Sequence, residues 1–534
     1  MGAIKKSRLR RGWREVALAS PAVVLGFTQI LTTFMAGDAV ADHATGTGGA
    51  LHVRVFDDFG GFDHVLAPHA GLSRLQVLFA VHDRLFEIST KSGKPVPRLA
   101  VRAAPRGDYK IWRVTLRPGV KFSNGEPVDA NAYVQHFKRL LNSEYARRFH
   151  AVMGAPLKKV TAPGKLVIEF QFSRSNPAFR ALLSHGGTYV WSINAPGFMA
   201  RNRMHPGLTG KSAGAGPYRI ALWEQGRRVV LKRNPDYWDP DIQHLDEITY
   251  HVVDEPGTEG VLRRLQSGRL DAAMITSDVA IQEALKPRRF SVYRRTLDQF
   301  GAMIGFNRAL APFGDPVVRL ALAQAIDRSR IARALGGSDA DVADQLFQGE
   351  RWRCRETGYP AFDPEGARNI LQALDVDFSA ISLWTEDEPP LRKAASLIQE
   401  MWASAGISIG VHVIAPQDRG LTYRVVAGRA AIWLQPLGPF VHPSLTDLSL
   451  HSASQQNISR LNSSKIDKAI ARLGKARTDK NIRDAHCGFE RLKTEVLPYL
   501  PVKRGVIGLI TRNDIGGVAL TGDPVIGYHR MYRK

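Results

Sequence analysis

One short motif around Ser212 has the residue types for nucleophilic chemistry. Gly210-Lys211-Ser212-Ala213-Gly214 matches the G-x-S-x-G pattern in which serine hydrolases hold their nucleophile. That pattern needs a buried apolar strand before the serine, so that a tight turn lifts the hydroxyl above a sheet. Residues 203–209 have the composition of a loop instead. We therefore predict that the match is accidental, and that an enzyme using Ser212 would have to show a base within its reach.

The same stretch resembles a phosphate-binding loop, and it fails there too. Gly210-Lys211-Ser212 matches the end of that motif, but His205 occupies the place of its first glycine and no strand leads in. The sequence has no pair of histidines spaced i,i+4 around a glutamate, and His64 and His69 lie five residues apart on a predicted loop. We predict that the chain has no catalytic residue, no metal site and no cofactor.

Strand and helix patterns alternate along the chain. Residues 51–55 and 111–117 alternate apolar and polar side chains, which predicts two strands. Residues 130–141 switch to helical spacing, and Asp129 is placed to cap that helix. Such alternation predicts an α/β protein.

Two helices in the second half share the same opening. Asp315-Pro316 and Asp363-Pro364 each combine an N-cap acid with a proline at the first helical position. We predict that the first of these helices continues to the glycine pair Gly336-Gly337. A third helix is predicted from 391 to 405, and residues 407–413 behind it alternate like a strand.

The first 41 residues predict export. They begin with a basic head, continue with a mostly apolar stretch from Val16 to Ala36, and offer small residues at Ala39 and Ala41 for a signal peptidase. This order is typical of a cleaved signal peptide, so we expect a periplasmic protein. An uncleaved anchor helix is the alternative, since the apolar stretch is long enough to span a bilayer. No cysteine follows it, so we expect no lipoprotein. Arg10-Arg11 leaves the choice between Sec and twin-arginine export open.

The chain is strongly basic and long enough for two or three domains. It has 534 residues, a net charge of +23 and a pI near 10.1. Such a charge attracts anionic partners, which include acidic ligands, lipid headgroups, lipopolysaccharide and nucleic acid. The basic residues are scattered and lack the interleaved aromatic residues of a nucleic-acid platform. We therefore predict a solvated basic surface and no nucleic-acid partner.

The chain has two cysteines, Cys354 and Cys487, and no CxxC or Cys/His metal cluster. An oxidising compartment would allow them to form a disulfide. Because they lie far apart in the sequence, the pattern leaves open whether they meet.

A series of blocks follows one another in a characteristic order. They are Lys94–Ala100 (KPVPRLA), Leu116–Val128 (LRPGVKFSNGEPV), Gly214–Tyr218 (GAGPY), Arg233–Trp238 (RNPDYW), Gly268–Asp271 (GRLD), and Phe306–Arg328 with FN, PFGD, VR and AIDR inside it. With them the chain from about Leu51 to Val502 resembles the oligopeptide/dipeptide/nickel-binding family of ABC-transporter solute-binding proteins, family 5. The third block has Ala215 where the family pattern has threonine. We interpret the blocks as scaffold, because their glycines and prolines suit turns.

The resemblance implies the α/β fold called periplasmic binding protein-like II, in its three-lobed oligopeptide-binding form. Lobe I would comprise residues 50–77, 205–300 and 500–534, lobe II residues 78–204, and lobe III residues 301–499. It also implies hinged lobes that close on a small solute in the cleft between them, and delivery of that solute to the ABC permease subunits of the inner membrane. We expect a monomer that does no chemistry on its ligand.

One departure from the family pattern concerns the ligand. Peptide binders of this family hold the ligand's α-ammonium with an aspartate in lobe III, but no carboxylate occurs between Ile432 and Pro443 here. A buried ammonium without a partner charge would cost several kcal/mol. Either Glu386 or Asp387, near Trp384, substitutes for that aspartate, or the ligand is not a free-amine peptide.

The expected ligand contacts follow from position in the family pattern. They are Pro68, His69, Ala70, Trp384, Thr385, Trp433, Gln435 and Phe440. We expect a peptide or peptide-like solute, and the surplus of positive charge would suit an anionic or blocked peptide. The alternatives are a non-peptide ligand, such as an opine, a sugar-acid conjugate or a metal chelate, and a basic protein that binds the envelope surface.

Overall fold

The structure is a computed structural model that describes residues 47–534 with gaps. The gaps are 57, 60, 63–71, 144–152, 154, 185–192, 202–210, 254–257, 276–289, 346, 348–350, 416–419, 437–441, 446, 455–456 and 522–524. The predicted signal peptide and four expected ligand contacts (Pro68, His69, Ala70 and Phe440) lie outside the described residues. None of the helices within the described part combines the length and the apolar character that a bilayer span needs.

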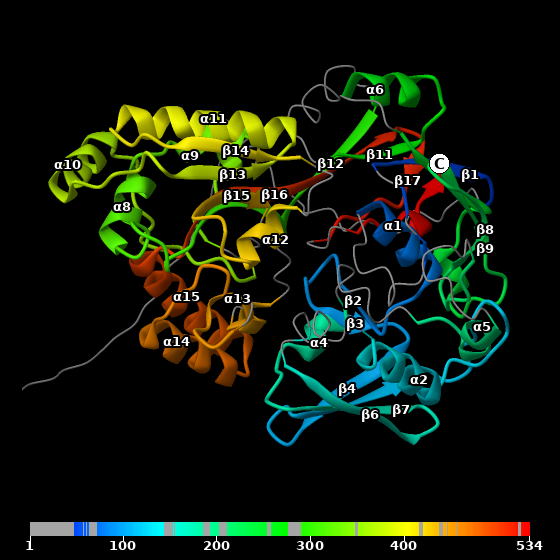
Figure 1. Ribbon diagram of the computed structural model, residues 1–534. Coiled ribbons are helices and arrows are strands. Elements are labelled where there is room, and N and C mark those ends of the chain that lie inside the picture. The colour runs from blue at the N-terminus through cyan, green and yellow to red at the C-terminus, as the bar shows by residue number, and fades with distance from the viewer. Residues whose placement is uncertain are drawn as a thin grey trace, which may run out of the picture. The chain divides into compact units, whose positions relative to one another are not determined.

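The largest element is a mixed sheet of ten strands (Figure 1), in the order β14-β13-β15-β12-β16-β11-β1-β10-β9-β8. Its strands are β1 (Ala50–Val55), β8 (Tyr218–Glu224), β9 (Arg228–Arg233), β10 (Glu247–Val252), β11 (Ala272–Ile275), β12 (Phe290–Phe306), β13 (Ser382–Glu386), β14 (Gly410–Ile414), β15 (Ile432–Pro436) and β16 (Tyr499–Arg512). Strand β1 runs parallel to β10 and β11, and β13 runs parallel to β14 and β15. The mixed sheet confirms the predicted α/β class.

Two long strands join the two ends of this sheet. β12 and β16 are antiparallel: Phe290–Leu297 pairs with Gly505–Arg512 beside β11, and Ala302–Gly305 pairs with Tyr499–Lys503 beside β15. The register shifts between the two paired regions. A methyl group on Gly301 would lie 2.2 Å from a backbone oxygen of β16, so the close approach requires glycine there. The shift adjoins the predicted boundary between lobes I and III, which stays a prediction.

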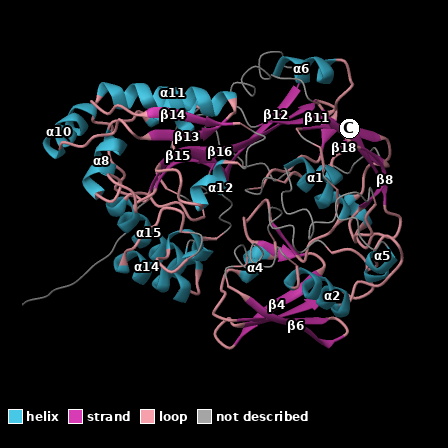
Figure 2. Ribbon diagram, in the orientation of Figure 1, coloured by secondary structure: helices cyan, strands magenta, loops and turns pink. Residues whose placement is uncertain are grey.

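Helices cover both faces of the β14-β13-β15 end (Figure 2). The elements in this region are α8 (Pro316–Gln324), α9 (Arg328–Ala334), η3 (Asp339–Asp341), α10 (Pro364–Leu374), α11 (Pro389–Ser404), α12 (Leu421–Val426), η4 (Pro443–Leu445), α13 (Asp447–Leu450), α14 (Ser464–Lys475) and α15 (Asp479–Val496). The N-cap predictions are confirmed, because Asp315 accepts a hydrogen bond from the Val317 amide at 2.8 Å and Asp363 accepts one from the Gly366 amide at 2.9 Å. Figure 1 shows α11 lying along β13 and β14.

Two predicted boundaries were wrong. The helix that starts at Pro316 ends at Gln324, and a separate helix starts at Arg328. The reason is Asp327, whose carboxylate accepts hydrogen bonds from the amides of Ser329 and Arg330 and so caps a new helix. The strand predicted at 407–413 starts only at Gly410, because the Ile407 amide still bonds to Trp402 and closes the end of α11.

Residues 86–201 form a second, smaller unit of sheet and helix. Its four-stranded sheet has the order β4-β5-β7-β6, and a separate hairpin pairs β2 with β3. The elements are β2 (Phe86–Ile88), β3 (Pro95–Pro97), β4 (Ala100–Arg106), β5 (Ile111–Leu116), α2 (Ala130–Leu141), β6 (Leu157–Gly164), β7 (Val167–Phe172), α4 (Phe179–Leu182) and α5 (Pro196–Arg201). As predicted, Asp129 caps α2, accepting from the Ala132 amide at 2.9 Å.

The remaining elements lie beside β1, β10 and β11. They are α1 (Leu72–Val81), η2 (Pro240–Ile242), α6 (Thr258–Gln266), β17 (Ile515–Gly516), η5 (Tyr528–Arg530) and β18 (Tyr532–Arg533). Their apolar core includes Val53, Val77, Ile248 and Leu509, each with no more than 1% of its surface exposed.

A buried ionic network connects the RNPDYW block to the end of α1. Asp83 accepts hydrogen bonds from the Tyr237 hydroxyl at 2.7 Å and the Trp238 indole at 2.9 Å, and it pairs with the Arg98 guanidinium at 3.2 Å. Arg98 also pairs with Asp239 at 2.6 Å. The side chains of Arg98 and Asp83 are only 9% and 8% exposed. These family-pattern residues therefore tie the predicted lobes I and II together, in agreement with their interpretation as scaffold.

We predict that Asp83→Ala destabilises the protein by about 3–5 kcal/mol, because it leaves the Arg98 charge buried without its main partner. Thermal unfolding followed by circular dichroism measures the change. The control is Asp484→Ala, which breaks an exposed pair with Lys480 within α15 and should change stability by about 1 kcal/mol or less. Equal effects of the two substitutions would contradict the role given to the network.

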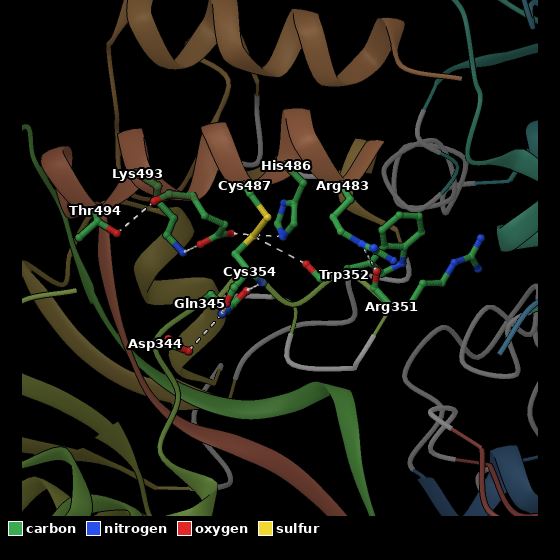
Figure 3. Close-up of a disulfide and its surroundings, with 11 residues drawn as sticks. Asp344, Gln345, Arg351, Trp352, Cys354, Arg483, His486, Cys487, Lys493 and Thr494 are labelled. Carbon is green, nitrogen blue, oxygen red and sulfur yellow. Dashed lines mark hydrogen bonds and ion pairs between the residues drawn. A yellow bond between two sulfur atoms is a disulfide. The ribbon is translucent and has the colours of Figure 1, made fainter. Parts of the chain in front are cut away.

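A separate core, within the predicted lobe III, surrounds the cysteines. Cys354 and Cys487 form a disulfide across 133 residues (Figure 3), which settles the question that the sequence left open. His442 and His486 are buried beside it, and desolvation lowers the pKa of each to about 3. Among the described residues, neither ring nitrogen of His486 has a hydrogen-bond partner. Both histidines are therefore neutral in the folded protein at neutral pH.

These two histidines predict an acid-sensitive stability. In the unfolded chain histidine has a pKa of about 6.5, so below that pH the unfolded state binds protons that the folded state excludes. Stability should be complete above about pH 6.5 and fall as the pH drops toward the folded-state value. We expect the melting temperature to decrease from pH 7.5 to 5.0, and to decrease less in the His442→Gln/His486→Gln variant. The control is His451→Gln, since His451 is 37% exposed, and it should leave the slope unchanged.

Candidate functional site

The expected ligand contacts that the structure describes lie on two neighbouring strands. Trp384 and Thr385 belong to β13, and Trp433 and Gln435 belong to β15. The strands are parallel, with Trp384 level with Trp433, and Glu386 and Gln435 each follow two residues further along. Both strands end here, and in open α/β sheets ligands bind beyond the carboxyl ends of the strands. The structure thus brings these predicted residues to one sheet edge.

Side chains alternate between the two faces of β13, which separates Thr385 from the others. Thr385 is fully buried, and its hydroxyl donates a hydrogen bond to the Leu434 carbonyl at 3.3 Å. Trp384, Trp433, Glu386 and Gln435 lie on the opposite face. Thr385 therefore holds the two strands together, and its contact with a ligand stays a prediction.

Trp433 packs against the neighbouring strand β12. It is 1% exposed, and a methyl group on Gly305 would lie 2.3 Å from its ring, so the indole lies flat where β12 has no side chain. It belongs to a small core with Leu421 and Val425 of α12. Its indole nitrogen is buried without a hydrogen-bond partner among the described residues. Trp433 is therefore part of the core beneath this face. Trp384, by contrast, is half-buried, and the centre of its ring lies 4.2 Å from the centre of the His412 ring.

The structure distinguishes the two acids that the sequence left as alternatives. Asp387 pairs with Arg392 of α11 at 3.1 Å. Glu386 is half-buried, and its carboxylate has no hydrogen bond or ion pair with any described residue. Burial, with the charge of Glu386 as a lesser cause, raises the pKa of the next acid, Glu388. Glu386 is therefore the carboxylate on this face that remains available to a cationic group.

Sequence reasoning missed the pairing of Glu386 with Gln435 as a unit. The two residues are 49 positions apart, and only the parallel pairing of β13 with β15 places them on neighbouring strand ends. A signal against Asp387 was present, since Arg392 follows it at the start of a predicted helix. That signal is weak, because its meaning depends on where the helix begins.

Ser212 does have a base within reach. The His82 Nε2 atom lies 3.1 Å from the Ser212 hydroxyl oxygen. That hydroxyl donates a hydrogen bond to the Asn194 side-chain oxygen at 2.6 Å, and the same oxygen also accepts a hydrogen bond from the Ala213 amide. The other nitrogen of His82 faces the carbonyl of Ile193 at 3.0 Å, where a catalytic triad has a carboxylate. His82 is 1% exposed, so this arrangement fits a locked loop better than a nucleophile.

The described residues include no group of three or more histidine, cysteine, aspartate or glutamate side chains able to hold a metal ion. The polar groups on this face include Glu386 and Gln435, which can bind an ammonium group and donate or accept hydrogen bonds, and His412, which is level with Trp384. This chemistry suits capture of an organic solute.

Comparison with known families decides the identity of the chain. Residues 94–458, more than half of it, match the model "Bacterial extracellular solute-binding proteins, family 5 Middle". The chain belongs to family 5 of the bacterial extracellular solute-binding proteins.

Individual relatives agree with this membership. The chain is 24% identical to a probable di/tripeptide-binding protein 5 of Pseudomonas aeruginosa, over 82% of this chain and 86% of that protein. It is 25% identical to the nickel-binding periplasmic protein of Escherichia coli, over 80% and 84%. The fold matches the dipeptide-binding protein of Pseudoalteromonas sp. SM9913 in complex with Met-Leu, with a TM-score of 0.75, 18% identity and coverage of 91% and 100%. The periplasmic-binding-protein fold predicted from the sequence is confirmed.

The packing of Trp433 on Gly305 gives a test of this site. We predict that Gly305→Ala destabilises the protein by about 1–3 kcal/mol, because the added methyl group overlaps the buried indole. The matched control is Gly474→Ala within α14, where the methyl group would meet nothing within 4 Å and should be neutral or slightly stabilising. Differential scanning calorimetry compares the two melting temperatures, and a stable Gly305→Ala protein would show that Trp433 has room to move.

Proposed function

We propose that this chain is the receptor of an ABC importer, and that it captures a peptide or peptide-like solute with a free ammonium group and delivers it to the membrane permease. The observation that carries the proposal is the carboxylate of Glu386, which has no partner among the described residues and lies on the sheet face that also has Trp384 and Trp433. In peptide binders of this family, an aspartate of lobe III supplies the carboxylate that holds the ligand's ammonium group. That aspartate is missing here, and Glu386 would take its place. The names of the P. aeruginosa and Pseudoalteromonas relatives support a peptide ligand.

The proposal places the mature chain in the periplasm as a monomer, after removal of residues 1–41 and without a lipid anchor. The disulfide between Cys354 and Cys487 supports an oxidising compartment. The receptor itself does no chemistry. In support, the Ser212 hydroxyl donates its hydrogen bond to the Asn194 side-chain oxygen, and the far nitrogen of His82 faces the carbonyl of Ile193.

A second candidate is a non-peptide solute in the same family. It is favoured by the absence of a carboxylate between Ile432 and Pro443 and by the net charge of +23. The nickel-binding relative shows that peptide recognition is not universal among similar proteins. In this case the ligand would be an opine, a sugar-acid conjugate or a metal chelate.

Native mass spectrometry of the protein as purified separates the two candidates, because deep binding sites often retain their ligand. We expect an adduct that fragments as a short peptide. An adduct identified as an opine, a sugar acid or a metal chelate would replace the peptide assignment while leaving the receptor function intact.

Glu386→Gln tests the carboxylate directly, with trialanine and N-acetyl-trialanine as probes in isothermal titration calorimetry. We expect the wild type to prefer the free amine, and the variant to lose about 2 kcal/mol or more of that affinity, roughly thirtyfold, because a desolvated charge pair is broken. The controls are Asp387→Asn, whose carboxylate is already paired with Arg392, and Glu365→Gln on the exposed face of α10. If both probes bind the wild type equally, Glu386 does not hold an ammonium group.

A further inference from the structure

Two turns of lobe II contact the start of α15 in lobe III. Arg477, just before α15, pairs with Asp108 at 2.8 Å and donates a second hydrogen bond to the Ser175 hydroxyl at 3.2 Å. Its guanidinium carbon lies 4.6 Å from the centre of the Tyr109 ring. One arginine thus makes an ion pair, a hydrogen bond and a cation–π contact across the two lobes.

The turn of lobe II at this contact is a tight hairpin turn. Asp108 and Tyr109 are its two central residues, with φ angles of 51° and 63°, and the Lys110 amide donates a hydrogen bond to the Gly107 carbonyl at 3.1 Å. This is the type I′ geometry that short β-hairpin connections favour. The turn joins β4 to β5 and presents both side chains to Arg477.

A second set of contacts lies at the first residue of α15. Asp479 pairs with Arg351 at 3.1 Å and with Lys94 of lobe II at 3.7 Å. Arg351 also donates a hydrogen bond to the Gly93 carbonyl of lobe II at 3.4 Å. Gly93 and Lys94 lie in the turn of the β2–β3 hairpin, so a second turn of lobe II engages the same end of the helix.

The disulfide holds Arg351 in place for this contact. Figure 3 shows Cys354 joined to Cys487 of α15, with Arg351 and Trp352 lying beside Arg483 of the same helix. The Arg483 guanidinium donates a hydrogen bond to the Arg351 carbonyl at 3.1 Å. The segment from Arg351 to Cys354 is therefore tied to α15 by a covalent bond and by a hydrogen bond.

We propose that these contacts form a clasp between lobes II and III, made of Lys94, Asp108, Arg351, Arg477 and Asp479 and anchored by the disulfide. The clasp favours the state in which the two lobes touch, and so slows the escape of a bound solute. The statement about solute rests on the proposed function, whereas the statement about lobe contact does not.

The ion pairs of the clasp are exposed to solvent, so the clasp can open. Asp108 is 70% exposed, Lys94 63% and Asp479 45%. Exposed ion pairs are individually weak, and salt screens them. Several such pairs together favour the closed state but leave the open state accessible. A receptor that must release its ligand requires both states.

The experiment measures the distance between the lobes in the full chain, without solute. Spin labels are placed at Lys138→Cys in α2 and Arg472→Cys in α14, both exposed, while the native disulfide stays intact. Double electron–electron resonance then gives the distribution of distances after exhaustive dialysis. We expect the long-distance population to rise about three- to tenfold in Arg477→Ala, and likewise in the parent protein at 1 M salt.

A double-mutant cycle identifies the pair responsible. Asp108→Asn, which keeps a residue that tolerates the left-handed region, should resemble Arg477→Ala, and the double variant should add little to either. Lys480→Ala is the matched control, since Lys480 lies on α15 but pairs with Asp484 of the same helix. Unchanged distances in both Arg477→Ala and Asp108→Asn would overturn the clasp. Because no ligand enters the measurement, that outcome would leave the proposed function standing.

Trialanine provides the link to function. If the clasp slows escape, its stopped-flow dissociation rate from Arg477→Ala should rise with the open population, severalfold, and remain unchanged in Lys480→Ala. Wider lobes with an unchanged dissociation rate would overturn the effect on retention and confine the clasp to lobe contact. Failure of trialanine to bind even the wild type would count against the peptide assignment instead, and the distance measurement would still decide the clasp.

Discussion

The structure depends on one constraint: β12 and β16 must satisfy each other's backbone hydrogen bonds in both halves of the sheet. Backbone N–H and C=O groups that are buried have to be paired. The ladder meets this requirement on each side of the register shift, between Leu297 and Ala302. At the shift itself Gly301 allows the close approach to Lys503. Nearby, Arg294 of β12 pairs with the buried Asp341 of η3. The register shift between β12 and β16 therefore lies where both strands cross the predicted boundary between lobes I and III.

Local features of this fold could be predicted from the sequence because their causes are local. An acid before a helical pattern, as at Asp129 and Asp363, caps the helix through an amide two or three residues away. The break before α9 was missed because Asp327 fits both a helix interior and a cap, and only the geometry decides. The Asp83 network and the disulfide could not be predicted, since each joins residues that are more than a hundred positions apart.

In the candidate site, too, the sequence predicts local features but not the contacts between distant residues. Position in the family pattern named Trp384 and Gln435 as candidates, but the face of each side chain depends on which helix covers the sheet. Thr385, one residue along, consequently lies in the core against Leu434. The choice between Glu386 and Asp387 required the position of Arg392, which the start of α11 determines. The residue types thus suggested which side chains could contact a ligand, and the packing of the folded chain determined which of them are available.

Burial separates the two kinds of contact that the predicted lobe II makes. Toward the predicted lobe I, Arg98 is 9% exposed and pairs with Asp239 at 2.6 Å. Asp83, 8% exposed, accepts hydrogen bonds from Tyr237 and Trp238 of that lobe. Separating the two would take these buried charges from their partners. Toward lobe III, lobe II relies on pairs such as Arg477 with Asp108, where one partner is 70% exposed and water can replace the lost contact. Breaking the contact with the predicted lobe I therefore costs more free energy than breaking the contact with the predicted lobe III. If the predicted lobe boundaries hold, lobes I and II should therefore move as one body, and the hinge against lobe III should lie at the register shift of β12 and β16.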